Sequence, residues 1–358
     1  MQSRLVYIDL LRAFAITLVI AGHVMPFAGF GSKIEYCNGI IHSFHMPLFA
    51  ILSGLFFSAD ISCREFFRKK SRQLLLPLVS WCFIVYVIVA LITWIYEWMN
   101  GGDSVHLFAT VRNFWYGLTD WGWWFIRALF FCFVYAYSAM RICQGRTVLA
   151  IIVSVLLLFS ASFLGVIPNK MPLLIGFVFL YPFFCVGILL KRYNDRIENR
   201  KKHFALLSFL LFAVMLFFWH GYEDTYYSMN TSIFETDGYH GICGTIIIWK
   251  TLFRFLIGTA GSLASYFLFS TLFDNKHAGQ SSVLQFFAGI GQCSLMIYIL
   301  HGFVIDELNK RDFVLNQDTL SILFITVLLT VVLLFACYFV AKLTLQNKWL
   351  SLLLWGKS

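Results

Sequence analysis

Residues 5–27 read LVYIDLLRAFAITLVIAGHVMPF, an apolar stretch that carries Asp9, Arg12 and His23. Its length matches the ~20 mostly apolar residues that cross a bilayer as one helix. Ionisable side chains are rare in such helices because it is costly to take a charge out of water, so they usually face a polar cavity or one another. The stretch predicts a membrane protein whose first helix carries functional groups.

The composition of the 358-residue chain agrees with this, because 60% of its residues are hydrophobic and only 13% are charged. These values exclude a soluble globular protein and indicate an all-α, polytopic integral membrane protein. The nine cysteines include no Cys-x-x-Cys pair, so neither a disulfide framework nor a metal site is indicated. We expect one membrane domain over residues 1–358.

The apolar runs predict about ten transmembrane helices, although two of the runs are short. In chain order they are Leu5 to Val24, Ile40 to Phe57, Leu74 to Tyr96, Trp123 to Met140, Val148 to Phe163, Leu173 to Leu190, Phe204 to Phe218, Thr251 to Phe273, Leu284 to Leu300 and Leu320 to Val340.

Lysine and arginine residues predict the orientation, since they concentrate in cytoplasmic loops. If Met1 is cytoplasmic, eighteen of the 27 basic residues fall on the cytoplasmic side and only five on the other. Both termini are therefore expected in the cytoplasm. The net charge of +9 then follows from the topology and does not indicate a nucleic-acid partner.

Two longer loops on the opposite side, Glu97–Gly122 and Trp219–Lys250, are rich in acidic and aromatic residues. Carboxylates and hydroxyls beside aromatic rings suit a sugar, which stacks its ring faces and exchanges hydrogen bonds through its hydroxyls. An ordinary solvated loop with interfacial tyrosines explains the same composition equally well.

Arg12 and His23 share one face of the predicted first helix. At ~100° and ~1.5 Å per residue, their spacing leaves them within ~20° of each other and ~16 Å apart along the axis. Asp9, three residues before Arg12, is expected to pair with it. The alternative is that Asp9 and Arg12 reach the inner membrane interface and His23 the outer one.

The second run also carries polar groups. His42 and His45 lie at its predicted outer end, where Pro47 is expected to break the helix and free backbone groups. The basic segment FFRKKSR follows this run, and Arg68 and Arg72 share a face if the third helix starts early. Two guanidinium groups on one face suit a phosphate, although binding of anionic lipid headgroups explains the cluster as well.

Five segments in order, YIDLLRAFAI with a following GH, FHMPLFAILSG, RKKSRQLLLP, WWFIRALF and SLMIYILH, resemble the membrane-bound acyltransferase 3 family, the O-acetylases of surface polysaccharides and lipopolysaccharide. The resemblance spans Tyr7 to His301. It implies about ten helices and transfer of an acyl group from cytoplasmic acyl-CoA to a hydroxyl presented at the far side of the membrane. It also implies the cytoplasmic (inner) membrane of a bacterium.

The family's signature of an arginine and a histidine matches Arg12 and His23. A sugar hydroxyl is a weak nucleophile that needs a base, and an imidazole titrates near neutral pH, so we expect His23 to be catalytic. The family's basic motif matches the segment after the second run, with Lys69 where an arginine is common. The expected site for the phosphates of acetyl-CoA comprises Arg12, Asp9 as its partner, Arg68, Lys69 and Arg72.

Four residues are candidates for the acceptor site: His45, Trp124, Arg127 and His301. Plainer explanations are an interfacial histidine for His301 and an aromatic-belt anchor for Trp124, whereas Arg127 must find a partner. Lys250 and Arg254, four residues apart, rank below these candidates, and anchoring at the membrane interface explains them as well.

The expected partners are the bilayer, acyl-CoA and a glycan acceptor, with no nucleic acid and no metal. A transporter or flippase of glycan intermediates is the rival function, although paired halves with matching interrupted helices are missing from the sequence. A non-catalytic partner of a glycan synthase would leave the stripe of Arg12 and His23 unexplained.

Overall fold

The structure is a computed structural model that describes residues 5–29, 32–99, 114, 118, 123–163, 174, 176–219, 244–273, 281–309 and 319–357. Within these ranges the chain forms helices and turns and no β-strand, so the all-α prediction is confirmed there. The chain divides into two compact units. The first comprises Met1–Phe57, Ser162–Gly165 and Phe179–Lys342, and the second comprises Ser58–Ala161, Val166–Val178 and Leu343–Ser358.

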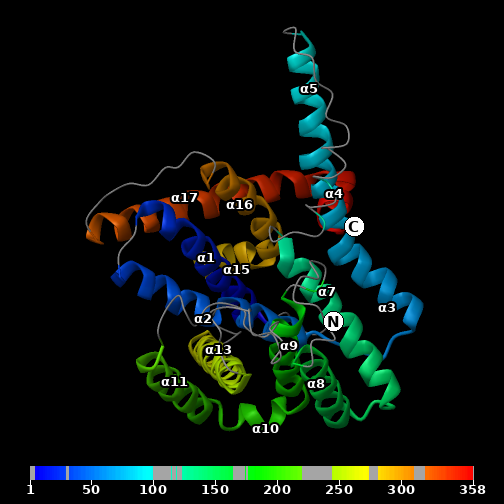
Figure 1. Cartoon of the computed structure of the whole chain (residues 1–358), viewed down its shortest axis with the longest axis vertical. Coiled ribbons are helices and arrows are strands. Elements are labelled where there is room, and N and C mark those ends of the chain that lie inside the picture. The colour runs from blue at the N-terminus through cyan, green and yellow to red at the C-terminus, as the bar shows by residue number, and fades with distance from the viewer. Residues whose placement is uncertain are drawn as a thin grey trace. The chain divides into compact units, whose positions relative to one another are not determined.

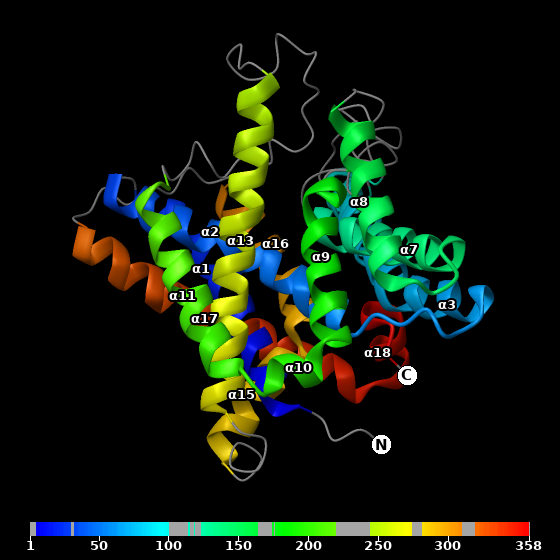
Figure 2. The same cartoon turned by 90° about the horizontal axis from the view of Figure 1, so that it is seen from below.

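Among the described residues, nine helices lie wholly or mostly in the first unit, and Figures 1 and 2 label them. They are α1 (Val6–Ala28), α2 (Ser32–Leu55), α9 (Phe177–Arg192), α10 (Asn194–Glu198), α11 (Lys201–Phe217), α13 (Gly244–Leu272), α15 (Ser282–Gln292), α16 (Ser294–Asn309) and α17 (Thr319–Gln346).

Helix α1 is central to the first unit, because it packs against α2, α13, α15 and α16 (Figure 1). Leu11, Ile16 and Ile20 on α1 are fully buried. The approach of α15 is so close that a Cβ atom on Gly291 would lie 1.7 Å from the main-chain oxygen of Asp9. Only glycine allows two backbones to approach in this way.

Helix α2 contradicts two details of the prediction. It begins at Ser32, so His42 and His45 lie well inside the helix and not at its outer end, and it continues through Pro47 to Leu55. Proline removes one backbone donor and crowds the preceding turn, but a helix persists when neighbouring groups satisfy the freed carbonyl. The predicted break at Pro47 was therefore wrong.

The predicted ninth run is not one straight helix. It is broken at Cys293 into α15 and α16, which are bent by 66° relative to each other. Helix α16 then continues to Asn309, so His301 lies in its middle and does not end the run. The apolar pattern of the sequence continues across the bend, which explains why hydropathy alone does not reveal it.

The second unit begins with one long succession of helical segments. These are α3 (Cys63–Lys70), η1 (Ser71–Leu75), α4 (Leu76–Phe83), η2 (Ile84–Ile88) and α5 (Val89–Met99), in which η marks a wider π-helical turn. The Ser62 hydroxyl accepts from the backbone N–H of Glu65, which caps the N-terminus of α3. This cap explains why helix formation starts before the apolar run at Leu74.

The second unit also contains α7 (Trp124–Ile142), α8 (Thr147–Phe163) and the short α18 (Lys348–Trp355). The indole of Trp81 on α4 donates to the carbonyl of Leu354 (3.2 Å) and its ring lies 5.3 Å from that of Trp355, so α18 packs on α4. Helix α18 was not among the predicted elements, because eight residues are too few for a membrane span.

In the described part of the chain, five helices are long and apolar enough to cross a membrane, and the bent pair of α15 and α16 would make a sixth. The five are Val6–Pro26, Cys63–Tyr96, Trp124–Ile142, Ile248–Leu272 and Thr319–Gln346. Helices correspond to all ten predicted runs, but ten membrane spans and cytoplasmic termini remain predictions. Most of the two loops predicted to be external lies outside the described residues, namely residues 100–113, 115–117, 119–122 and 220–243.

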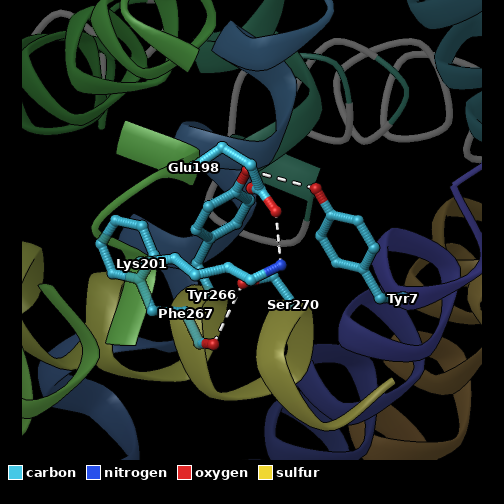
Figure 3. A network of polar contacts seen from close by, with 6 residues as sticks. All are labelled: Tyr7, Glu198, Lys201, Tyr266, Phe267 and Ser270. Atoms are coloured by element: carbon cyan, nitrogen blue, oxygen red, sulfur yellow. Dashed lines mark hydrogen bonds and ion pairs between the residues drawn. The ribbon is translucent and has the colours of Figure 1, made fainter. Parts of the chain in front are cut away.

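A polar network joins the start of α1 to its neighbours in the first unit (Figure 3). The hydroxyls of Tyr7 and Tyr266 lie 3.3 Å apart, and the carboxylate of Glu198 is drawn beside them. Lys201 pairs with Glu198 at the start of α11, the helix that lies along α13 in Figure 2. The hydroxyl contact joins α1 to α13 at Tyr7, two residues before Asp9.

Candidate functional site

Three helices of the first unit bring four histidines together. The ring centroid of His23 on α1 lies 5.5 Å from that of His301 on α16 and 6.3 Å from that of His42 on α2. The rings of His42 and His45 are 4.9 Å apart. Residues from both ends of the chain thus form one cluster of imidazole groups, which we call the histidine cluster.

Three of the four imidazoles are held by their own helices. Nδ1 contacts the carbonyl oxygen four residues earlier in His42 (2.9 Å to Asn38), His45 (2.8 Å to Ile41) and His301 (3.0 Å to Ile297). A carbonyl oxygen only accepts hydrogen bonds, so each Nδ1 carries the hydrogen. In the neutral ring the lone pair is then on Nε2 in all three residues.

His23 differs from its neighbours in exposure. His45 and His301 are each 3% exposed, whereas the side chain of His23 is exposed although it lies inside α1. Among the described residues, no hydrogen bond holds its ring. His23 is therefore the member of the cluster that a substrate can reach most directly.

Among the residues that the structure describes, no group of three or more histidine, cysteine, aspartate or glutamate side chains is placed to hold a metal ion. Chemistry at the cluster can instead use the imidazoles as acceptors and donors of protons.

Arg254 on α13 lies behind the cluster and is only 3% exposed. Its Nη1 donates to the main-chain oxygen of Ser43 (3.0 Å) and its Nη2 to that of His42 (2.6 Å). The guanidinium also lies against the rings of Trp219 (5.1 Å) and Phe179 (5.4 Å). These buried contacts exclude the alternative of an interface anchor for Arg254.

Asp9 and Arg12 occupy the other part of α1. Nη1 of Arg12 lies 3.5 Å from Oδ1 of Asp9, which is the predicted contact, and the guanidinium lies 4.9 Å from the ring centroid of Phe56. A further partner comes from α15, where Nε2 of Gln292 donates to Oδ2 of Asp9 (3.2 Å). Asp9 is 3% exposed, so these donors satisfy a buried carboxylate.

The basic cluster of residues 68–72 lies in the second unit. It is helical, which the predicted binding of phosphate by Arg68 and Arg72 requires. Arg68 and Lys69 lie in the last turn of α3 with exposed side chains, and Arg72 is half-buried in the π-helical turn that follows. Lys70 lies 3.5 Å from the ring centroid of Phe133 on α7. The cations that remain accessible to an anion are therefore Arg68, Lys69 and, in part, Arg72.

Trp124 and Arg127 belong to the second unit as well. Arg127 is 3% exposed and donates to the carbonyl of Leu118 (2.8 Å), which gives this arginine the partner it was predicted to need. The ring of Trp124 lies so close to Gly176 that a Cβ atom there would be 2.2 Å from it. Arg127 therefore has a backbone partner and Trp124 packs against Gly176, whereas a part of either residue in an acceptor site stays a prediction.

The sequence carried a signal for one of the two contacts that it did not identify, the contact of Arg254 with α2. Pro47 leaves the carbonyl of Ser43 without its helical donor, and a buried arginine such as Arg254 must find acceptors, so the two needs match. Gln292 had no comparable signal, because its contact with Asp9 depends on the bend at Cys293. His42 was noted in the sequence but was not among the site residues.

Comparisons with known proteins point in one direction. The family model described as "Acyltransferase domain" matches residues 5–341. The "Nodulation protein NolL" of Mesorhizobium japonicum is 26% identical over 336 residues, which cover 89% of this chain and 82% of that protein. The protein of the same description from Sinorhizobium fredii is 24% identical over 234 residues, covering 63% of this chain and 60% of that protein. No solved structure matches the chain.

Proposed function

We propose that this chain, which belongs to the acyltransferase 3 family of membrane acyltransferases, moves an acetyl group from cytoplasmic acetyl-CoA to a hydroxyl of a surface glycan or of its lipid-linked precursor. The observation that carries the proposal is the histidine cluster, in which the exposed His23 lies beside the buried His301. An exposed imidazole inside a membrane helix is suited to receive a proton from a hydroxyl.

The proposed reaction is a direct transfer. His23 takes the proton of the acceptor hydroxyl while the hydroxyl oxygen attacks the thioester carbonyl carbon. The carbon–sulfur bond then breaks, and the imidazolium of His23 returns the proton to the departing thiolate. The products are an O-acetyl ester and coenzyme A, and His23 is neutral again.

The neighbouring histidines suit this role of His23. In their neutral forms His42 and His301 offer an Nε2 lone pair beside it, because Nδ1 of each donates to a backbone carbonyl. They can therefore accept hydrogen bonds from an imidazolium or from the acceptor sugar. Trp124, Arg127 and His45 remain candidates for contacts with the glycan.

The proposed donor site consists of cations at helix positions. Arg68, Lys69 and Arg72 carry fixed positive charge that suits the phosphates of coenzyme A, and guanidinium groups can bind phosphate oxygens in pairs. Arg12, which belongs to the first unit, is proposed separately as a donor-binding residue, because it is only partly buried beside Asp9. The ground of the proposal is the same for each residue except Asp9: its side chain is a cation that can donate hydrogen bonds to a phosphate.

The proposed location is the cytoplasmic (inner) membrane of a bacterium, with both termini in the cytoplasm. The charge distribution of the loops supports the orientation, and both similar proteins come from bacteria. In this orientation the donor is cytoplasmic and the acceptor lies on the opposite side.

A comparison of surface glycans tests the proposal. Cells with the wild-type protein should carry glycan with an added acetyl mass that mild alkali removes, and cells without the protein should lack it. Cells with His23→Ala should resemble cells without the protein. Glycan of unchanged mass in all three would contradict the proposed function.

A further inference from the structure

We infer that Arg254 is a positioning residue: it replaces the backbone donor that Pro47 removes from α2 and so holds the turn that carries His42 and His45 beside His23. The inference rests on the proposed function, because it gives Arg254 a part in a reaction at His23. In this role Arg254 acts through the backbone of α2 and contacts neither acetyl-CoA nor the glycan acceptor.

The missing donor follows from helix geometry. In an α-helix the N–H of each residue donates to the carbonyl four residues earlier, so the N–H of residue 47 would serve Ser43. Pro47 has no N–H and lies inside the continuous helix α2. Nη1 of Arg254 lies 3.0 Å from the oxygen that Pro47 leaves unserved, and Nη2 lies 2.6 Å from the oxygen of His42.

The contact belongs to one face of α13. Arg254, Gly258 and Ser262 are spaced by four residues and therefore lie on the same side of the helix. A Cβ atom on Gly258 would lie 2.9 Å from Cγ of Pro47, so α13 approaches α2 closely at the proline. Ser262 donates to the main-chain oxygen of Phe44 (3.2 Å), and α13 thus serves three successive carbonyls of α2.

Arg254 is itself held in place. Its guanidinium lies 5.1 Å from the ring centroid of Trp219 and 5.4 Å from that of Phe179, and the side chain is 3% exposed. A planar cation between rings has little freedom to move. The position of the carbonyls of Ser43 and His42 is thereby fixed relative to α13.

The turn of α2 that Arg254 holds carries His42, whose ring lies near that of His23. His42 lies 6.3 Å from His23 between ring centroids and 4.9 Å from His45. A displacement of about 1 Å in a group near the reacting atoms can lower the rate by about 100-fold. Loss of the brace should therefore reduce the rate of the chemical step more than the binding of the donor.

A double-mutant cycle tests the inference. Arg254→Met should lower kcat by about 10- to 100-fold and leave the KM for acetyl-CoA within about twofold. Pro47→Ala restores a backbone N–H for Ser43, so in that background Arg254→Met should lower kcat by less than about threefold, a clear failure of additivity. An equal loss of kcat in both backgrounds would overturn the inference.

Two further variants sharpen the cycle. Lys250→Met removes a cation one turn earlier on α13, and its effect should be small and the same in both backgrounds. Arg254→Lys keeps the charge but cannot match the two-pronged donor geometry, so it should lose part of the activity and regain it with Pro47→Ala. This variant keeps the test valid if Arg254→Met does not fold.

Thermal unfolding of the wild type, Arg254→Met, Pro47→Ala and the double variant separates the role of Arg254 from the proposed acetyl transfer. Arg254→Met should lower the unfolding midpoint when Pro47 is present and lower it less in the Pro47→Ala background. If this coupling is present but no variant or wild type transfers acetyl groups, the proposed function fails and the role of Arg254 on α2 stands. If acetyl transfer is measured but the cycle is additive in both readouts, the role of Arg254 fails alone.

Discussion

The imidazole rings of His23 and His301 lie 5.5 Å apart between centroids, although their helices stand near opposite ends of the chain. Their contact depends on the packing of α16 and the neighbouring α15 against α1. The side chain of His301 is buried and held by the carbonyl of Ile297, whereas His23 is exposed and free of such a bond among the described residues. The pair thus combines one accessible imidazole with one fixed imidazole.

His301→Gln tests the fixed member of this pair. Turnover should fall by about 10- to 100-fold, at or below the low end of what one acid–base group contributes, because His23 remains in place. Binding of coenzyme A should be unchanged. The kinetics of the purified variant decide the question, with His203→Gln at the exposed start of α11 as the control. A His301→Gln protein with wild-type turnover would remove His301 from the site.

Gly291→Ala tests the close approach of α15 to α1. The added methyl group would meet the main-chain oxygen of Asp9 at 1.7 Å, and backbone cannot move aside as a side chain can. The stability should fall by at least about 1–3 kcal/mol, the usual cost of overpacking. Gly289→Ala is the matched control, since its methyl group would meet the flexible hydroxyl end of Tyr338. Equal unfolding midpoints for both variants would contradict this packing.

Arg72→Ala tests the proposed donor site. If the basic cluster grips the phosphates, calorimetric titration with coenzyme A should show binding weakened by about 1.5–3 kcal/mol, the scale of a hydrogen bond to a charged group. Arg12→Ala should weaken binding at least as much, because it also removes a cation from the buried Asp9. Arg141→Ala, an exposed cation of α7, should bind as the wild type does. Unchanged affinity in Arg72→Ala would place the donor elsewhere.

Cysteine labelling tests the orientation. In a background without the nine native cysteines, a cysteine in place of Ser228 should react with an impermeant thiol reagent added outside the cell. One in place of Asn199, an exposed residue between α10 and α11, should stay unlabelled. The reason is the concentration of lysine and arginine on the side of Asn199. The opposite labelling pattern would reverse the topology.

Local patterns in the sequence were sufficient for much of the fold. The apolar runs located the helices, because burial of side chains against lipid or protein needs a continuous apolar segment. The three-residue spacing of Asp9 and Arg12 predicted their contact, since both lie on one helix. The early start of α3, on which the helical placement of Arg68 depends, follows from a capping serine.

Contacts between helices far apart in the sequence could not be predicted from such local patterns. Nothing local indicates that Gln292 donates to Asp9, because the bend at Cys293 and the glycine beside Gln292 decide that contact. Pro47 was read as a helix break because proline lacks a donor, but the donor came from Arg254, more than two hundred residues away. Long-range satisfaction of a backbone group thus overrode a local preference.

The most direct test of the central claim is acetyl transfer by purified protein. The wild type in detergent, given acetyl-CoA with a labelled acetyl group and glycan from cells that lack the protein, should move the label to an alkali-labile ester and release coenzyme A. His23→Ala should remain folded, bind coenzyme A and transfer at least about 100-fold more slowly, as expected when a general base is removed. Transfer by His23→Ala at the wild-type rate would contradict the account.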